Sequence, residues 1–180
     1  MEINGKPIIW YLMMHYSNYG FNEFIILGGY KVASLKEYFL KYKELSSDLL
    51  IAFKSNRVSY IGGDSPLIAT WKVTILDTGL DSFTGKRLML ARDIVGDDTF
   101  LLTYGDGLSN VNLNHLISFH KDQKSHVTLT AVQPDGRWGS IDIDRNKKVV
   151  SFLEKPKGDG SWINGGFFVC EKEIFDYLGN

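Results

Sequence analysis

The stretch EFIILGG (residues 23–29) predicts a short strand that is buried on both faces. Four apolar residues follow one another without a polar break, and two glycines end the run. Strands of this kind are typical of parallel sheets covered by helices on both sides. The next segment, SLKEYFLKYKEL (34–45), returns to helical spacing, with lysines on the side away from its apolar residues. The two segments together predict the start of a strand–helix–strand unit.

The same alternation of strands and helices continues along the chain. Helical patterns cover residues 7–20, 84–95 and 112–123, with Thr84 as a possible N-cap and with Asn112 or Asn114 near the start of the last helix. Strand patterns cover residues 48–54, 71–79, 99–104, 126–133 and 163–170, and a helix begins after residue 170. Residues 55–70 fit neither pattern. The alternation predicts a Rossmann-like, doubly wound, mostly parallel α/β sheet.

One further segment predicts a hairpin at the edge of this sheet. Residues 139–155 contain two alternating runs around a polar turn at residues 144–147. The hairpin makes the expected sheet mixed. In sheets of this class, ligands bind at the carboxyl ends of the strands, near the point where the strand order reverses.

Composition limits the class of protein. The 180 residues are 44% hydrophobic and 23% charged, which is enough for one core, so we expect a single domain over residues 1–180. Twenty basic residues balance 21 acidic ones, so no global positive field favours nucleic acid or a membrane surface. Cys170 is the only cysteine, which excludes a disulfide framework within the chain. Without an apolar run long enough to span a bilayer, we expect a soluble, cytoplasmic protein.

The first candidate for chemistry is Asp106, which stands between Gly105 and Gly107 where a buried strand ends. A carboxylate there suits Mg²⁺, which binds one or two carboxylates together with phosphate oxygens of a substrate. Flanking glycines would let those phosphates approach the backbone. The alternative is an ordinary turn whose aspartate caps the next helix.

The second candidate is the segment EKPKGDG (154–160), which follows the hairpin. Glu154 could accept hydrogen bonds from sugar hydroxyls, while Lys155 meets a phosphate. The alternative is a solvated charged turn. Asn164 and Gly165 stand inside the apolar strand INGGFFV (163–169), where a glycine indicates either close approach of a ligand or a bulge.

Two weaker candidates complete the set. In GRWGS (136–140), Trp138 could wall a sugar pocket or pack on the hairpin. The segment DTGLDSFTGKR (77–87) offers backbone N–H groups and a basic pair for phosphates or the edge of a base.

Other kinds of site find no support in the sequence. It contains no Walker A loop, no dinucleotide-binding glycine fingerprint and no nucleophile elbow. His115 and His120 are five residues apart and do not share a helix face, so a metal pair is not expected and both are interpreted as surface residues.

Taken together, the segments resemble the sugar-phosphate nucleotidyltransferases over nearly the whole chain. The motifs YGDG, EKPKGDG and INGGFF occur in the order and spacing of that family, and the DTG and TGKR segments are similar to its cytidylyltransferase branch. The resemblance implies a nucleotide-diphospho-sugar transferase-like fold. It also implies an enzyme of nucleotide-sugar biosynthesis, of the kind that serves O-antigen and lipopolysaccharide, in which CTP and α-D-glucose 1-phosphate give CDP-glucose and pyrophosphate.

The resemblance also assigns roles to residues. It implies that Asp106 binds Mg²⁺ and that Asp106, Lys155 and Arg87 carry catalysis. The substrate-binding residues that it implies are Thr78, Gly79, Gly105, Gly139, Glu154, Lys155, Asn164 and Gly165. It implies substrates that are small molecules, with neither nucleic acid nor membrane as partner, and a homo-oligomer for the full-length enzyme.

Family members also have parts that do not match any residue of this sequence. The resemblance implies a first strand with a glycine-rich phosphate loop before residue 1, and a second metal-binding carboxylate after residue 180. We therefore expect negligible turnover from these 180 residues alone. Two alternatives stay open: a related uridylyl- or thymidylyltransferase, and a non-catalytic module that binds sugar nucleotides.

Overall fold

The computed structural model describes residues 2–62, 67–157 and 161–179. Its helices are α1 (Ile8–Ser17), α2 (Val32–Leu40), α3 (Tyr42–Ser46), the 3₁₀ turn η1 (Ile68–Thr70), α4 (Thr84–Met89), α5 (Arg92–Val95), α6 (Leu113–Gln123) and α7 (Ile174–Tyr177). Its strands are β1 (Glu2–Ile3), β2 (Lys6–Pro7), β3 (Glu23–Gly28), β4 (Asp48–Ala52), β5 (Arg57–Ile61), β6 (Lys72–Asp77), β7 (Phe100–Leu102), β8 (Val127–Val132), β9 (Ser140–Ile143), β10 (Val149–Leu153) and β11 (Ile163–Cys170).

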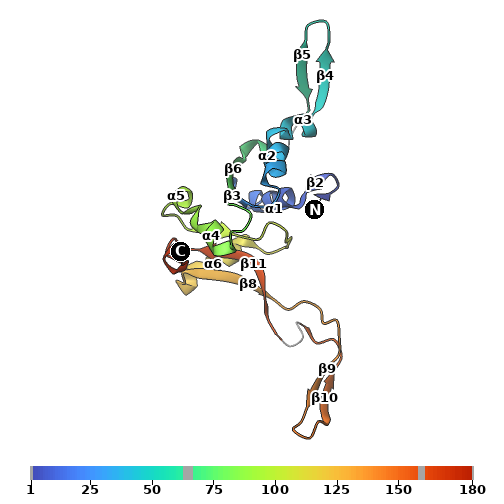
Figure 1. Ribbon diagram of the computed structural model, residues 1–180, viewed down its shortest axis with the longest axis vertical. Helices are drawn as coiled ribbons and strands as arrows, with labels where there is room; N and C mark the ends of the chain where they lie inside the picture. Colours follow the sequence, from blue (N-terminus) through green and yellow to red (C-terminus); the bar gives the residue numbers. More distant parts are fainter. Residues whose placement is uncertain (1, 63–66, 158–160, 180) are drawn as a thin grey trace.

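The strand that opened the sequence analysis pairs in parallel with a later one. β3 and β6 run side by side from Glu23 opposite Lys72 to Gly28 opposite Asp77. The chain between them includes α2 and α3, which lie along the pair (Figure 1). The prediction of a parallel strand–helix–strand unit is confirmed here.

A second sheet has the order β7, β11, β8. β11 is antiparallel to both of its neighbours, so β7 and β8 run in the same direction and are joined through α6. The crossover is therefore the one that strand–helix alternation predicts, with a later strand inserted between its two strands. The mixed α/β class is confirmed, and the parallel hydrogen bonding that the structure describes is that of β3 and β6.

The core that holds these parts together is centred on α1. Leu12 and Tyr16 of α1 form a buried cluster with Leu113 of α6 and Phe167 of β11. The rings of Tyr16 and Phe167 stack with centroids 5.9 Å apart and planes 15° apart. Each such side chain contributes about 1.5 to 3 kcal/mol of burial energy, so α1 is the helix that fastens the second sheet to the rest of the chain.

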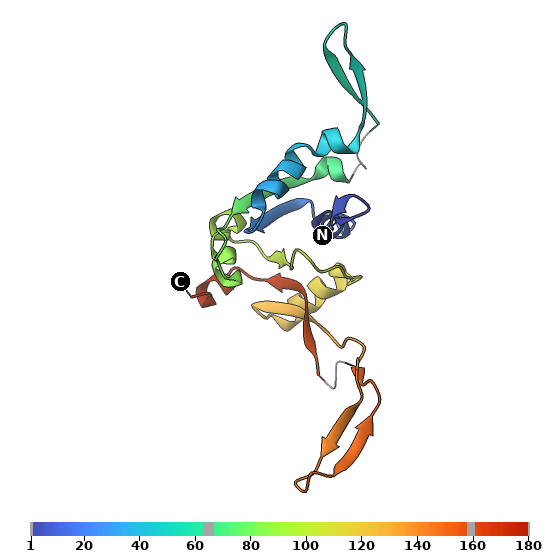
Figure 2. The ribbon, with the colours of Figure 1, turned by 45° about the vertical axis from the view of Figure 1, so that its right-hand side comes forward.

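Two hairpins project at opposite ends of the molecule (Figures 1 and 2). β9 and β10 form the predicted hairpin, but its expected place at the edge of the sheet is wrong, because among the described residues these strands pair with each other in a sheet of their own. Its turn is fixed by the Asp144 carboxylate, which accepts from the backbone N–H groups of Asn146 and Lys148 at 2.7 and 2.9 Å. β4 and β5 form the other. Residues 48–54 were expected to continue the alternation of the main sheet, and that expectation is wrong because their partner strand lies in the segment that fitted no pattern.

Local details also differ from expectation. Thr84 was predicted as an N-cap, but it is the first helical residue and Phe83 precedes it without a side-chain cap. The helix predicted over residues 84–95 is two short helices, because the N–H of Ala91 bonds to the carbonyl of Leu88 in a tighter turn. Of Asn112 and Asn114, which were both expected near the start of this helix, Asn112 is the N-cap of α6, where its side chain accepts from the N–H of His115.

Candidate functional site

The first group of predicted site residues lies where β3 and β6 end. The N–H and the hydroxyl of Thr78 both donate to the carbonyl oxygen of Gly28, at 2.8 and 2.7 Å. Thr78 is buried, so these bonds tie the DTG turn to the neighbouring strand away from water. Gly79 follows with a φ of +82°, a value that side-chain-bearing residues rarely adopt.

Arg87 of α4 reaches back into this group. Its Nη1 donates to the Thr78 hydroxyl at 2.5 Å and to the Gly28 carbonyl at 3.3 Å, and its Nη2 donates to the carbonyl of Leu80 at 3.0 Å. The guanidinium group thus holds both ends of the turn. In this geometry Arg87 positions the DTG loop, and a direct contact with a nucleotide stays a prediction.

The two glycines after β3 make this arrangement possible, and sequence reasoning missed them as site residues. A Cβ atom on Gly29 would lie 2.6 and 2.7 Å from Nη2 and Cζ of Arg87, and one on Gly28 would collide with the side chain of Val32. The sequence signal was present, since a glycine pair directly after a buried strand indicates close approach of other groups.

The second group surrounds Asp106, which is exposed just beyond β7. Neither Gly105 nor Gly107 has a positive φ. Cβ atoms at these two positions would meet nothing within 4 Å among the described residues. Neither backbone conformation nor local packing therefore requires a glycine on either side of this carboxylate.

Asn164 belongs to the same group because β11 has a bulge. The strand changes register with β8 between Asn164 and Phe168, and Gly166 and Phe167 have φ values of +75° and +49°. The Asn164 amide donates to the hydroxyl of Tyr104 at 3.0 Å and its oxygen accepts from the N–H of Gly166 at 2.9 Å. The bulge thus brings Asn164 beside the chain that leads to Asp106.

Gly165 has a packing reason of its own. A Cβ atom there would lie 2.8 Å from Cγ1 of Val132 and 3.1 Å from the carbonyl oxygen of Thr130, both on β8. The strand interior has no room for a larger residue at this position.

The third group lies at the base of the β9–β10 hairpin. A Cβ atom on Gly139 would lie 2.7 Å from the ring of Phe152 and 3.4 Å from the Glu154 carboxylate. Lys155 has a φ of +45°. A Cβ atom on Gly136 would lie 3.0 Å from the Cα of Lys155, so the segment before β9 and the segment after β10 lie close together here. Trp138 is 76% exposed. Residues 158–160 of the EKPKGDG motif lie outside the described residues.

The structure therefore gathers the predicted residues into three groups. Among the hydrogen bonds and ion pairs of the described residues, none joins Asp106 to Lys155 or either of them to Arg87. Within the described ranges, no cluster of three or more His, Cys, Asp or Glu side chains could hold a metal ion. A single exposed carboxylate fits a cation that arrives with substrate phosphates and keeps its waters.

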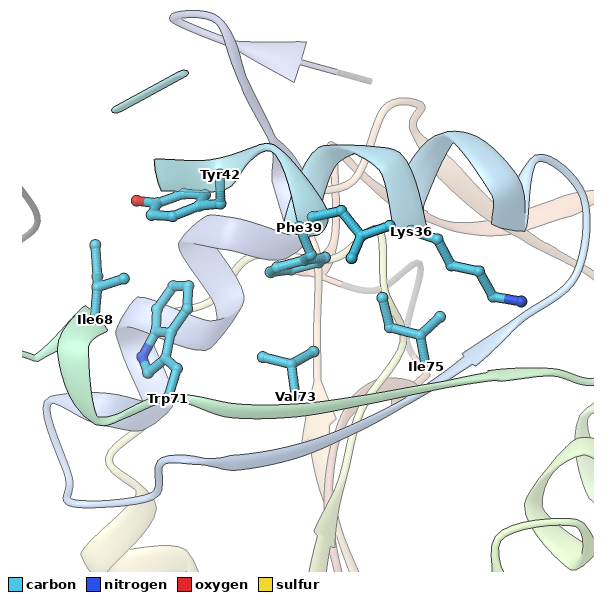
Figure 3. Close-up of a pocket in the computed structure, with 8 residues that line it drawn as sticks. Lys36, Phe39, Tyr42, Ile68, Trp71, Val73 and Ile75 are labelled. Carbon is cyan, nitrogen blue, oxygen red and sulfur yellow. The ribbon is translucent and has the colours of Figure 1, made fainter. Parts of the chain in front are cut away.

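A recess of about 540 Å³ lies elsewhere, between α2, α3 and one face of β6 (Figure 3). Its lining is mostly apolar and comprises Lys36, Phe39, Leu40, Tyr42, Ile68, Trp71, Val73 and Ile75. Val73 and Ile75 of β6 and Trp71 directly before it are two residues apart along the chain, and they face the rings of Phe39 and Tyr42 (Figure 3). None of the predicted site residues lines it.

His120 was interpreted as a surface residue, and that interpretation is wrong. Its side chain is only 2% exposed because it lies on the face of α6 that packs on the sheet. Its ring nitrogens lie 2.8 Å from the Thr128 hydroxyl and 2.9 Å from a carboxylate oxygen of Glu171. Thr99 donates to the other oxygen at 2.8 Å. Both hydrogen bonds lower the pKa of Glu171, with that from Thr99 the larger cause.

Comparisons with known proteins agree with the arrangement of motifs. Residues 1–180 match the family described as "Nucleotidyl transferase". A probable glucose-1-phosphate cytidylyltransferase of Bacillus subtilis is 44% identical over 98% of the chain and 67% of that protein. The glucose-1-phosphate cytidylyltransferase of Salmonella typhimurium is 45% identical over 100% of the chain and 69% of that protein. The chain thus spans about two thirds of the length of these relatives.

A solved structure shows the same fold. HddC from Yersinia pseudotuberculosis, crystallised in complex with GMP-PN, superposes with a TM-score of 0.64 at 21% identity, over 100% of this chain and 69% of that one.

Within the residues that the structure describes, none of the helices combines the length and the apolar character that crossing a bilayer demands.

Proposed function

The chain belongs to the nucleotidyl transferase family, and on that premise we propose that it transfers CMP from CTP to α-D-glucose 1-phosphate, which gives CDP-glucose and pyrophosphate. The support for this base and this sugar is the 44 to 45% identity to glucose-1-phosphate cytidylyltransferases over nearly all of the chain.

The observation that carries the proposal is the open space around Asp106. Glycines flank the carboxylate although neither their φ values nor their neighbours demand it. A residue without a side chain is then best explained by the approach of a group from outside the chain, and a triphosphate is the part of CTP that needs such room. The simple turn that the sequence left open as an alternative gives no reason for either glycine.

The reaction asks the protein mainly for positioning and charge neutralisation, because both reactants are anions. A phosphate oxygen of the sugar phosphate forms a bond to the α-phosphorus of CTP, and the bond from that phosphorus to the bridging oxygen breaks, so pyrophosphate leaves with the electron pair. Lys155 would neutralise the attacking phosphate, and Glu154 would accept hydrogen bonds from sugar hydroxyls.

Reactions of this family use a divalent metal, and we propose Mg²⁺ held by Asp106 through the carboxylate. When bound, the ion supplies charge neutralisation to the phosphates. Asn164, fixed by its hydrogen bonds to Tyr104 and Gly166, would orient the sugar on the same side of the strand end.

The DTG loop is proposed to meet the cytosine. Arg87 and Thr78 hold this loop through three acceptors, which are the carbonyls of Gly28 and Leu80 and the hydroxyl of Thr78. The backbone of the loop is therefore fixed before a nucleotide arrives. Preorganised backbone groups can select a base without an energetic cost of ordering at the moment of binding. We also propose that the protein works in the cytoplasm, since its buried free thiol, Cys170, suits a reducing compartment. That it forms a homo-oligomer is proposed from its family alone.

The test is pyrophosphate release by the protein as its complete gene encodes it, with Mg²⁺, glucose 1-phosphate and one of CTP, UTP or dTTP. CTP should give the highest kcat/KM. Gly105→Ala should leave the urea midpoint unchanged, because its methyl group enters space that no other described residue fills. It should lower kcat/KM at least ~10-fold, because that space is the one proposed for the triphosphate. A higher rate with UTP or dTTP would assign another base. CDP-glucose binding without turnover in any mixture would indicate a non-catalytic module.

A further inference from the structure

Tyr104 stands two residues before Asp106, and its ring is held from two sides. It meets the ring of Phe168 edge to face, with centroids 5.8 Å apart and planes 83° apart. It also lies against Gly166, where a Cβ atom would be 3.4 Å from Cδ2 of the tyrosine. The second glycine of the INGG motif thus leaves room for this ring. The tyrosine is nonetheless 45% exposed, so it is open to a ligand.

The directions of the hydrogen bonds beside Tyr104 follow from which groups can donate. The backbone N–H of Gly166 can only donate, so the end of the Asn164 amide that lies 2.9 Å from it is the oxygen. The other end is then the NH₂ group, which also can only donate. That nitrogen lies 3.0 Å from the oxygen of Tyr104, so the tyrosine oxygen is the acceptor.

These bonds leave hydrogen-bonding capacity unused at the surface. A tyrosine hydroxyl can donate one hydrogen bond besides accepting. Within the part of the chain that the structure describes, Tyr104 accepts from Asn164 and makes no bond in which its O–H is the donor. Asn164 keeps one N–H and one lone pair of its oxygen after its two bonds. Two unused donors therefore lie on atoms that are 3.0 Å apart, with an unused acceptor on the same amide.

This set of groups matches the hydroxyls of a sugar better than a phosphate. Two donors that lie this close together can both reach one acceptor oxygen. The remaining acceptor needs a ligand group that donates, and an ionised phosphate has none, whereas every sugar hydroxyl both accepts and donates. Neighbouring hydroxyls of a hexose could therefore satisfy all three groups.

We propose that the Tyr104 hydroxyl donates to a hydroxyl oxygen of the hexose, together with the free N–H of Asn164, and that Tyr104 thereby selects the sugar. The inference rests on the proposed function, because the hexose is that of glucose 1-phosphate and CDP-glucose. Since Phe168 and Gly166 fix the ring, the donor is in place before the sugar arrives.

The exposure of the site sets the size of the effect. A closed site that hydrogen-bonds a substrate hydroxyl rejects an analogue without it very strongly, because its buried groups stay unpaired. Tyr104 is about half exposed, so its hydroxyl can return to water and the loss is smaller. We expect ~10-fold weaker binding when either the tyrosine hydroxyl or the sugar hydroxyl that it contacts is removed.

Equilibrium binding tests this contact separately from turnover. Calorimetry would use the protein that the complete gene encodes, with CDP-glucose and its monodeoxy analogues, each of which lacks one hexose hydroxyl. The wild type should bind one analogue ~10-fold more weakly than CDP-glucose. Tyr104→Phe should bind CDP-glucose ~10-fold more weakly, yet bind that one analogue within ~2-fold of the wild type. Such a pattern requires contact between the two hydroxyls, since a structural role would weaken every ligand equally.

The matched control is Tyr177→Phe, which removes a hydroxyl from a tyrosine of α7 that is 71% exposed. It should bind all of the ligands like the wild type, and the urea midpoints of both variants should equal that of the wild type. The contact is overturned by an equal loss for every ligand in Tyr104→Phe, by no loss for any, or by a wild type that does not bind CDP-glucose.

The proposed function fails in a different way. A wild type that shows the expected selection among these ligands but releases no pyrophosphate from CTP and glucose 1-phosphate would refute the transfer and support the contact. Full turnover combined with an equal loss for every ligand in Tyr104→Phe would refute the contact alone.

Discussion

Because Arg87 approaches Gly29 closely, the effect of Gly29→Ala on the free energy of unfolding should depend on whether Arg87 is present. Gly29 does not have a positive φ, so alanine can adopt its backbone conformation without strain. The obstacle is the guanidinium group, since Nη2 and Cζ lie 2.6 and 2.7 Å from the position of the new Cβ. Arginine is flexible, so we expect Gly29→Ala to push its end away rather than move the backbone.

The cost is then the loss of the hydrogen bonds that Arg87 donates. They go to Thr78, Gly28 and Leu80, and the carbonyl of Gly28 keeps its two bonds from Thr78. The group is half-buried, so we expect Gly29→Ala to lower the free energy of unfolding by about 1 to 2 kcal/mol. Once Arg87→Ala has removed the obstacle, the same substitution should be neutral or stabilise by about 0.4 to 1 kcal/mol, because alanine restricts the unfolded chain.

Urea denaturation at pH 7 of the wild type, the two single variants and the double variant measures both values. The double variant should be at least as stable as Arg87→Ala alone. An equal loss of stability from Gly29→Ala in both backgrounds would refute the contact with Arg87 as the reason for the glycine. In the protein that the complete gene encodes, Gly29→Ala should also raise KM for CTP more than KM for glucose 1-phosphate, because the DTG loop is the part that loses support.

Three further predictions follow from single side chains. Asp106→Asn should abolish Mg²⁺-dependent pyrophosphate release and change the free energy of unfolding by less than about 0.5 kcal/mol, because Asp106 is exposed. The control is Asp98→Asn, an exposed aspartate at the other end of β7, which should keep full activity. Normal rates in Asp106→Asn would remove Asp106 from the metal site. The pKa of Glu171 is lowered from its ordinary 4.5 by hydrogen bonds from Thr99 and His120, so the stability that its carboxylate adds is complete above pH 4.5 and is lost as the pH falls through the lower folded-state pKa. Urea midpoints from pH 7 to pH 3 should therefore show the wild type losing its stability advantage over Glu171→Gln. A stability advantage that grows in acid would contradict this sign. Burial raises the pKa of the Cys170 thiol to about 11, so a thiol reagent at pH 8 should label the unfolded chain within minutes and the folded chain at least ~100-fold more slowly; equal rates would show that β11 opens readily.

The predicted elements and motifs are those that depend on nearby residues. The continuous apolar run of residues 24–27, the Asn112 cap and the turn at Asp144 were predictable because a local pattern decides each of them. The motifs around Asp106 and Asn164 were visible for the same reason, since glycines and polar residues interrupt apolar strands there.

Only the tertiary structure decided how these pieces meet. β11 inserts between β7 and β8, His120 is buried against Glu171, and Arg87 closes on Gly29 from 58 residues along the chain. Each of these contacts joins residues far apart in sequence, and its energy exists only after the chain has folded around α1. Periodicity and spacing report which face of an element is apolar, but they do not name the element that will cover it, and that choice places the residues of the site.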